Sequence, residues 1–306
     1  MKESYAPLVI FVYNRLDITK QMLKAINNNT LAPQTEVFIF SDGPKSEKDI
    51  DKVRGVRECI HEFKTVCRFK SIVVHEAEKN RGLANSIITG VSDVIKKYGK
   101  VIVLEDDLIT AQNFLTFMNQ CLQFYENNQR IWSIGGTTYR LNAFKNYSHD
   151  VYACYRGESC GWATWLDRWE QVDWAVSDLK KLLRSPQKRR QFNRGGQDMV
   201  ASLKLQMEGK TDSWAIRWCY QESKENMLTI LPVKSLVKNI GWDGTGTNCD
   251  ETDRFHTEIE GENFNFTLEN VEVDKQLMSD FCQYYSKPFS QRVLDWLYLK
   301  VKDYIR

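Results

Sequence analysis

The stretch VIVLEDDL, residues 101–108, sets four branched apolar side chains directly before three successive acids. An unbroken apolar run of this kind is typical of a strand that is buried on both faces of a sheet. Side chains alternate along an extended backbone, so we expect Glu105 and Asp107 to share one face and Asp106 to take the other. Neighbouring carboxylates repel one another, so the pattern predicts a site where a cation or hydrogen-bond donors offset their charge.

The acid triplet has two interpretations. In the structural one, the strand simply ends in solvated acids. In the functional one, the carboxylates bind a divalent cation, because Mg²⁺ and Mn²⁺ prefer oxygen ligands and often combine one or two carboxylates with phosphate oxygens. Three acids in succession exceed what an ordinary strand end carries. We therefore favour a cation that bridges to a diphosphate and offsets the charge on a departing nucleotide.

Strands and helices alternate around this stretch. Apolar runs predict strands at 7–13, 36–40, 71–75 and 100–104. Helical spacing of apolar residues predicts a helix capped by Asp17, a helix at 83–95 that Gly99 stops, and a helix at 114–122, and the charged stretch at 47–63 is also predicted to be helical. This order predicts an α/β fold with a mainly parallel sheet, in which ligands bind at the carboxyl ends of the strands.

The second half of the chain is less regular. Apolar runs predict strands at 131–134 and 151–155, and helical spacing predicts helices at 179–183 and 199–207. The basic stretch at 186–190 is interpreted as a kink. The Gly- and Thr-rich stretch at 241–247 is interpreted either as a lid over a bound ligand or as a plain connection.

Length and composition bound the function. The chain has 306 residues, of which 42% are apolar and 27% charged, and this excludes a disordered or collagen-like protein. A formal net charge of +2 gives no basic excess, so we expect no nucleic-acid partner. No apolar run approaches the roughly 20 residues of a membrane span, and the N-terminus does not resemble a secretory signal. We therefore expect a cytoplasmic protein whose eight cysteines, none in a CxxC pair, are reduced thiols rather than zinc ligands.

An ordered set of motifs accompanies the triplet. It comprises YNR at 13–15, SDG at 41–43, KNRGL at 79–83, Asn113-Phe114 after the triplet, GESCGW at 157–162 and DSW at 212–214. Together they resemble the GT-A-fold glycosyltransferases over roughly residues 7–256, most closely the N-acetylglucosaminyltransferase I type and related bacterial polysaccharide glycosyltransferases. The resemblance implies a GT-A, Rossmann-like fold with helices flanking a mainly parallel sheet and an acceptor-side C-terminal half.

The same resemblance implies an activity. The chain would be an inverting glycosyltransferase that uses Mn²⁺ or Mg²⁺. It would move a hexosyl or N-acetylhexosaminyl group from a UDP-sugar to a hydroxyl of a glycan or lipid-linked acceptor, in surface polysaccharide biosynthesis. One domain would span residues 1–285, with a nucleotide-sugar-binding half at 1–130 and an acceptor-side half at 131–285. The alternative is a nucleotide-sugar- or carbohydrate-binding protein without turnover.

The resemblance assigns roles to the acid cluster. It implies that Asp107 binds the metal, that Asp106 contacts the ribose and that Glu105 hydrogen-bonds within the nucleotide pocket. His256 would give a further metal contact, against the alternative of a surface histidine. Asn248 stands where some relatives carry a histidine directly after the Gly-Thr loop, which leaves the third metal ligand open.

Four further residues are assigned to the nucleotide sugar: Asn14, Arg15, Asp42 and Arg81. Arg15 would hold the base or a phosphate, or is a solvated residue at a helix start. Asp42 would lie near the uracil or ribose, or forms an ordinary Asp-Gly turn. Arg81 precedes a helix N-terminus, where anions are favoured, or caps that helix, or lies at the surface.

The acceptor side has three candidates. Asp212 would be the general base that deprotonates the acceptor hydroxyl, and its alternative is the N-cap of the helix that follows. Trp162, and with it Trp165, would stack on a sugar face or else pack in the core. Glu158 would bind sugar hydroxyls or else is a surface residue.

The C-terminal segment 286–306 predicts an amphipathic helix with several basic residues. Docking on its own domain is the favoured interpretation. Peripheral contact with an anionic membrane surface is the alternative, which a lipid-linked acceptor would suit.

Overall fold

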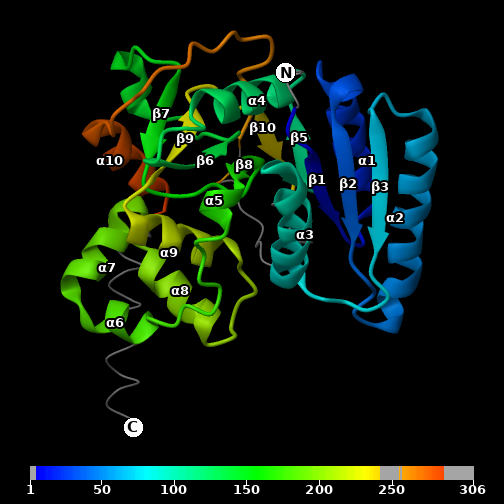
Figure 1. Cartoon of the computed structure of the whole chain (residues 1–306), viewed down its shortest axis with the longest axis horizontal. Helices are drawn as coiled ribbons and strands as arrows, with labels where there is room; N and C mark the ends of the chain where they lie inside the picture. The colour runs from blue at the N-terminus through cyan, green and yellow to red at the C-terminus, as the bar shows by residue number, and fades with distance from the viewer. Residues whose placement is uncertain (1–4, 242–254, 256, 286–306) are drawn as a thin grey trace.

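The computed structural model describes residues 5–241, 255 and 257–285 (Figure 1). Its first half alternates strands and helices as the sequence predicts. The elements are β1 (Leu8–Val12), α1 (Leu16–Asn27), β2 (Glu36–Ser41), α2 (Glu47–Val66), β3 (Ser71–Glu76), α3 (Leu83–Tyr98) and β4 (Lys100–Glu105). A short 3₁₀ turn at Ala32–Gln34 joins α1 to β2.

The second half adds shorter elements. They are β5 (Leu108–Thr110), α4 (Phe114–Phe124), β6 (Ile131–Gly135), β7 (Val151–Cys154), β8 (Trp162–Trp165), α5 (Leu166–Trp169), α6 (Leu179–Arg184), α7 (Pro186–Phe192), α8 (Met199–Met207), α9 (Ala215–Glu225), β9 (Leu228–Pro232), β10 (Val237–Asn239) and α10 (Lys275–Tyr284). Further 3₁₀ turns lie at Asn142–Asn146 and Asn193–Gly195.

One eight-stranded sheet in the order β3-β2-β1-β4-β8-β6-β9-β7 organises the molecule. The strands β3, β2, β1 and β4 are parallel, and β8 is antiparallel to both of its neighbours, β4 and β6. Beyond β8, β9 runs parallel to β6, and β7 is antiparallel to β9. The predicted α/β class with a mainly parallel sheet flanked by helices is thus confirmed. The parallel half brings the ends of β1, β2, β3 and β4 to a single edge.

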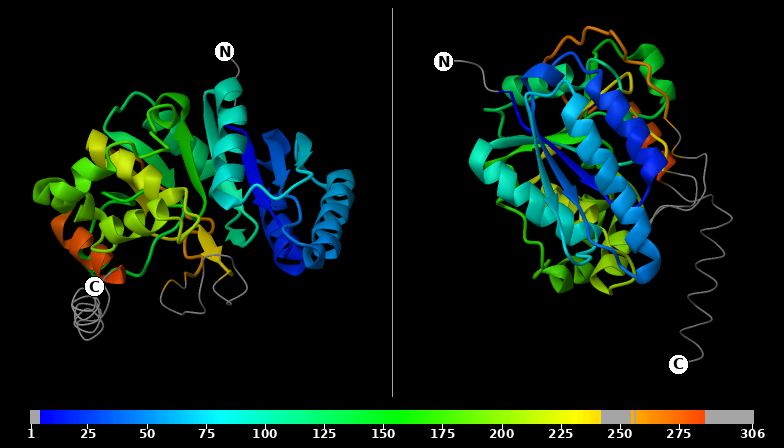
Figure 2. Two further views of the ribbon diagram at one scale, coloured as in Figure 1. Left: turned by 90° about the horizontal axis from the view of Figure 1, so that it is seen from below. Right: turned by 90° about the vertical axis from the view of Figure 1, so that its right-hand side faces the viewer.

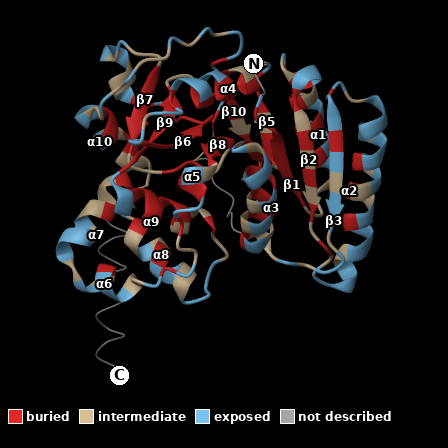
Figure 3. Ribbon diagram, in the orientation of Figure 1, coloured by how far each residue is buried: buried red, intermediate tan, exposed pale blue. Residues whose placement is uncertain are grey.

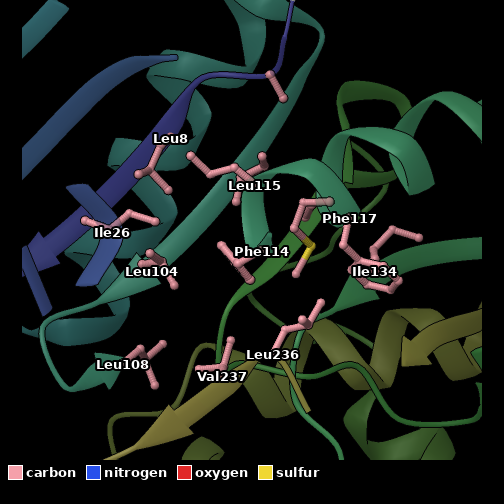
Figure 4. Packing of buried hydrophobic residues seen from close by; sticks show 14 of the residues in the cluster. Leu8, Ile26, Leu104, Leu108, Phe114, Leu115, Phe117, Ile134, Leu236 and Val237 are labelled. Carbon is pink, nitrogen blue, oxygen red and sulfur yellow. The ribbon is translucent and has the colours of Figure 1, made fainter. Parts of the chain in front are cut away.

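Alternate side chains of the buried strands enter two cores. Leu8 and Ile10 of β1 pack with α1, α2 and α4, whereas Val9 and Phe11 face α3. Figure 2 shows the parallel strands between α3 on one side and α1 and α2 on the other. Figure 4 shows the first core, where Leu8, Ile26, Leu104 and Phe114 meet from four elements. The inner strands are buried, while α2, α6 and α7 expose one face (Figure 3).

Some local predictions were wrong. Asp17 is not a cap, because α1 begins at Leu16 with Arg15 at its N-cap and Asp17 in the first turn. The basic stretch at 186–190 is not a kink but part of α7, with Pro186 in the first turn and the Ser185 hydroxyl capping it. Gly99 does end α3, where it adopts the left-handed conformation with a φ of 76°.

The predicted helix at 286–306 and most of the loop at 241–247 lie outside the described residues. Within the part of the chain that is described, none of the helices combines the length and apolar character that a membrane span requires.

Candidate functional site

The acid triplet sits where β4 ends. The extended backbone stops at Glu105, residues 106 and 107 form a turn, and β5 begins at Leu108. The prediction that Asp106 and Asp107 take opposite faces was therefore wrong, because it required an extended chain. Both aspartates instead approach the same guanidinium group, that of Arg15.

Arg15 follows β1, the strand next to β4, and links the two aspartates. Its Nη2 forms an ion pair with Oδ1 of Asp106 and a second one, 2.8 Å long, with Oδ2 of Asp107. Its Nε lies 3.5 Å from Oδ2 of Asp106. The three side chains are only 18%, 7% and 13% exposed, so these contacts are largely shielded from water. Nη1 of Arg15 is buried and hydrogen-bonds to no residue that the structure describes.

One guanidinium does not balance three carboxylates. Burial, together with the charges of Asp107 and Asp106, raises the pKa of Glu105 to about 8. Burial also raises the pKa of Asp106, although Arg15 acts in the opposite direction. Arg15 pairs with both Asp106 and Asp107, so one positive charge faces two aspartates in a shielded position, and an additional cation would stabilise their ionised form.

A hard divalent cation fits this donor set. Carboxylate oxygens are the ligands that Mg²⁺ and Mn²⁺ prefer, and such ions often complete their coordination with phosphate oxygens and water. Among the described residues, no group of three His, Cys, Asp or Glu side chains is arranged to hold a metal ion. His256, the predicted second protein ligand, lies outside the described residues.

The end of β10 closes against Asp107. The Ile240 N–H donates to the Asp107 carbonyl at 2.9 Å, and Asn239 accepts from the Gly241 N–H at 2.7 Å. A Cβ on Gly241 would lie 2.1 Å from Oδ2 of Asp107. A larger side chain here would force the Asp107 carboxylate or the backbone to shift, so the backbone of residue 241 forms one wall of the acid site.

Asp42 follows β2 and binds a neighbouring loop. Its Oδ1 accepts from the N–H groups of Gly43 and Arg81 at 2.8 and 2.9 Å, and its Oδ2 from that of Gly82 at 3.1 Å. The Asp-Gly turn is present, and the carboxylate also fixes residues 81–82 at the start of α3. Asp42 and Arg81 line a cavity of about 370 Å³, together with His75 at the end of β3.

Asn14 contacts a different group. Its amide nitrogen donates to Oδ1 of Asp49 at 3.1 Å, and Asp49 belongs to the capping box of α2 together with Ser46. The structure therefore places Asn14 against the N-terminus of α2.

Asp212, between α8 and α9, reaches the N-terminus of α3. Its Oδ2 accepts from the Ala84 N–H at 3.4 Å and would lie 3.0 Å from a Cβ on Gly82. The predicted alternative, a cap of the following helix, is not observed, since Trp214 holds the N-cap position of α9. Asp212 is half-buried and lies beside the loop that Asp42 fixes.

The predicted sugar-contacting residues are buried. Trp162 is fully buried on β8 and stacks on Trp214 with ring centroids 4.8 Å apart, so core packing describes it. Trp165 is also buried and donates from Nε1 to the Leu122 carbonyl. Glu158 is not a surface residue, because it is only 7% exposed, and its Oε1 accepts from the N–H groups of Ser159 and Cys160. Burial raises the pKa of Glu158.

Sequence reasoning did not single out two largely shielded charged residues of the second half. Arg156 forms two parallel contacts of 3.0 Å with Asp198. Glu222 on α9 has no exposed surface. An arginine in a loop and a glutamate on an amphipathic helix are usually solvated, so nothing in the sequence indicated that these two residues are shielded from water.

No family model matches the sequence, and no curated protein matches it. Among solved structures, a mannosyltransferase from Pyrobaculum calidifontis in complex with GDP-Man and Mn²⁺ is 12% identical with a TM-score of 0.38, over 72% of this chain and 74% of that chain. A crystal structure of S. aureus TarS is 11% identical with a TM-score of 0.31, over 42% of this chain and 21% of that chain. Likenesses this distant assign neither a donor nor an activity to this chain.

Proposed function

We propose that the chain is a metal-dependent glycosyltransferase that moves a sugar from a UDP-sugar to a hydroxyl of a glycan or lipid-linked acceptor. The supporting observation is the shielded, undercompensated pair Asp106 and Asp107 at the carboxyl edge of the parallel strands. Ligands of parallel α/β sheets bind at this edge, and a nucleoside diphosphate with its cation would balance the charge found there.

Each group around the edge has a part in this proposal. Asp107, with Asp106 beside it, would hold Mn²⁺ or Mg²⁺. When bound, the cation supplies positive charge to the leaving diphosphate. Arg15 adds a positive charge beside the same carboxylates. The cavity lined by Asp42 and Arg81 would take the nucleoside, because it lies at the same edge and offers polar groups.

Asp212 would act as the general base. The acceptor hydroxyl must lose its proton as it attacks the anomeric carbon from the side opposite the leaving group, which inverts that centre. Asp212 comes from the acceptor-side half yet lies against the loop at the start of α3. It is partly exposed, so a hydroxyl can approach it.

A thermal-shift panel of UDP- and GDP-sugars, with and without Mn²⁺, tests donor binding. Binding to the native state raises the melting temperature, so we expect a UDP-sugar to stabilise the chain only when Mn²⁺ is present. Asp107→Asn should abolish that shift while keeping the fold. Asp51→Asn, on the exposed face of α2, is the matched control and should keep it. If only GDP-sugars stabilise the chain, the donor is a GDP-sugar and not a UDP-sugar. If the donor raises the melting temperature of Asp107→Asn as much as that of the unmodified chain, Asp107 does not hold the metal.

Asp212→Asn separates binding from transfer. The amide keeps an oxygen that can accept from Ala84, so the N-terminus of α3 stays supported, but it cannot take a proton. We expect donor stabilisation to persist while UDP release falls by about 10²–10⁴-fold. Normal release by this variant would rule out Asp212 as the base.

The non-catalytic alternative has one observation in its favour, the hydrogen bond through which Asp212 caps α3. In that case the unmodified chain would bind the donor and Mn²⁺ but release no UDP, with water or with any glycan acceptor. Sugar transfer to a glycan or lipid-linked precursor of a surface polysaccharide would support a role in surface polysaccharide synthesis.

A further inference from the structure

The strongest observation that the proposed function leaves unused is where the Arg15 guanidinium lies. It occupies the space between Asp106 and Asp107 and pairs with one oxygen of each through the same nitrogen, Nη2. These oxygens belong to the two carboxylates that the proposed function assigns to a divalent cation. A guanidinium and a metal ion cannot both take them without placing two positive groups against each other.

We propose that Arg15 is an internal counter-cation that blocks the aspartate pair. A divalent ion would bind there tightly only after a nucleoside diphosphate has drawn the guanidinium away. This inference rests on the proposed function for the identity of the anion. The blocking contact itself stands on the geometry alone.

The arginine has a second, unsatisfied group that an anion would engage. Nη1 is buried and finds no hydrogen-bond acceptor among the described residues. A buried donor without a partner is costly, and a phosphate oxygen would relieve that cost by accepting from it. The same phosphate would compete with the aspartates for the guanidinium, so its binding and the release of the carboxylates are coupled.

Only the side chain of Arg15 needs to move. Its carbonyl accepts from both the N–H and the hydroxyl of Thr19, at 2.9 and 2.8 Å, which anchors the backbone to the first turn of α1. The guanidinium stands at the end of a flexible side chain that is 18% exposed. A change of rotamer therefore suffices, and the strands β1 and β4 stay in register.

A purely structural role predicts the opposite result. If Arg15 merely held the two carboxylates in place for the metal, its removal would weaken metal binding. If Arg15 blocks them, its removal strengthens metal binding in the absence of nucleotide. The sign of the change separates the two roles, and the readout requires no enzymatic turnover.

The experiment measures Mn²⁺ binding to the full chain by electron paramagnetic resonance of free Mn²⁺, first without nucleotide. We expect Arg15→Gln to bind Mn²⁺ at least tenfold more tightly than the unmodified chain. Arg130→Gln is the matched control, because Arg130 forms a similar two-pronged pair with Glu272 far more exposed to solvent. It should leave Mn²⁺ affinity unchanged. An Arg15→Gln affinity that is equal or lower overturns the proposal.

Two further arms keep the test decisive. UDP and GDP are each titrated into the unmodified chain at fixed Mn²⁺, after subtraction of the metal that the nucleotide binds by itself. The effective nucleotide should raise Mn²⁺ affinity of the unmodified chain at least tenfold, and that gain should shrink in Arg15→Gln. If Arg15→Gln does not fold, tight Mn²⁺ binding by the unmodified chain alone still refutes blocking. If neither nucleotide binds, the proposed function fails while the nucleotide-free comparison still tests Arg15.

Discussion

Glu222 is a buried carboxyl group that the proposed mechanism does not use. It lies on α9 with no exposed surface, and Oε1 accepts from the Thr229 hydroxyl at 2.8 Å. Oε2 is buried and makes no hydrogen bond within the described part of the chain. Burial raises the pKa of Glu222 to about 8. The residue is thus protonated in the folded chain at neutral pH and ionised in the unfolded one.

This difference makes stability depend on pH. Between the unfolded pKa of 4.5 and the folded pKa of about 8, the folded state binds one proton more than the unfolded state, so stability falls as pH rises through this window. Glu222→Gln removes the titration. Relative to the variant, the unmodified chain should lose about 2–4 kcal/mol between pH 5 and pH 8, measured by urea unfolding.

Glu225→Gln is the matched control, because Glu225 is exposed on the same helix. It should keep the pH dependence of the unmodified chain. Parallel stability curves for Glu222→Gln and the unmodified chain would show that Glu222 is ionised in the folded state.

Single residues of the site were predictable in kind but not in orientation. The apolar strand followed by three acids marked the edge, and the sequence also singled out Arg15 and Asp42. It did not indicate that Asp106 and Asp107 share one guanidinium. Residues 106 and 107 form a turn that brings the two aspartates to one side. Directly after it, β5 pairs with β10, and Leu108 lies opposite Asn239. Such a distant contact leaves no local pattern.

At the scale of elements, β10 and the β4–β5 turn form one unit around Asp107. Gly241→Ala would place a methyl group 2.1 Å from Oδ2 of Asp107, so the carboxylate or the β10 backbone must shift. We expect the affinity for the donor in the presence of Mn²⁺, measured from the thermal shift, to fall at least tenfold. The melting temperature without ligand should change little, because the clash lies at the rim of the sheet.

Gly55→Ala is the corresponding control within α2. A Cβ there meets only Leu16 Cδ2 at 3.7 Å, an ordinary contact, and alanine is favoured over glycine in a helix. This substitution should raise stability by about 0.5–1 kcal/mol and leave donor binding intact. Undiminished donor binding in Gly241→Ala would mean that Asp107 does not contribute through the oxygen that faces β10.

The elements of the first half were predictable because the apolar residues of each follow a clear strand or helix pattern. Strands buried on both faces are unbroken apolar runs, and α1 and α3 each carry an apolar stripe. In the second half, β8 and β10 span four and three residues and pair with strands far away in the chain, so their hydrophobic patterns are too brief to predict a strand. The prediction of a kink at 186–190 was wrong because it considered only the basic charges and not Ser185 and Pro186, which are typical of a helix start.

At the scale of the molecule, the candidate site draws residues from both halves of the sheet. Arg15, Asp42 and the acid triplet come from the parallel half, whereas Asp212 and Gly241 come from the second half. The order of elements predicts the first group, since parallel strands share an edge. It does not predict how the second half folds back, because that depends on β8 inserting antiparallel between β4 and β6.

Arg156 helps to hold the second half together across distant segments. It follows β7, contacts Asp198 before α8 through two 3.0 Å hydrogen bonds, and lies 3.6 Å from the ring centroid of Tyr285 after α10. Arg156→Lys keeps the charge but loses the planar fork and the stacking. We expect it to lower the free energy of unfolding by about 1–3 kcal/mol, measured by urea denaturation.

A double-mutant cycle with Asp198→Asn shows whether that loss belongs to the pair. Arg156 and Asp198 are 16% and 30% exposed, whereas Arg130 and Glu272 in a similar pair are 60% and 75% exposed. Water screens the outer pair far more, so its coupling energy should stay below about 1 kcal/mol, and that of the inner pair should exceed it. Equal coupling in the two cycles would indicate that Arg156 stabilises the chain mainly by stacking on Tyr285, so that Tyr285→Leu should then reproduce the loss.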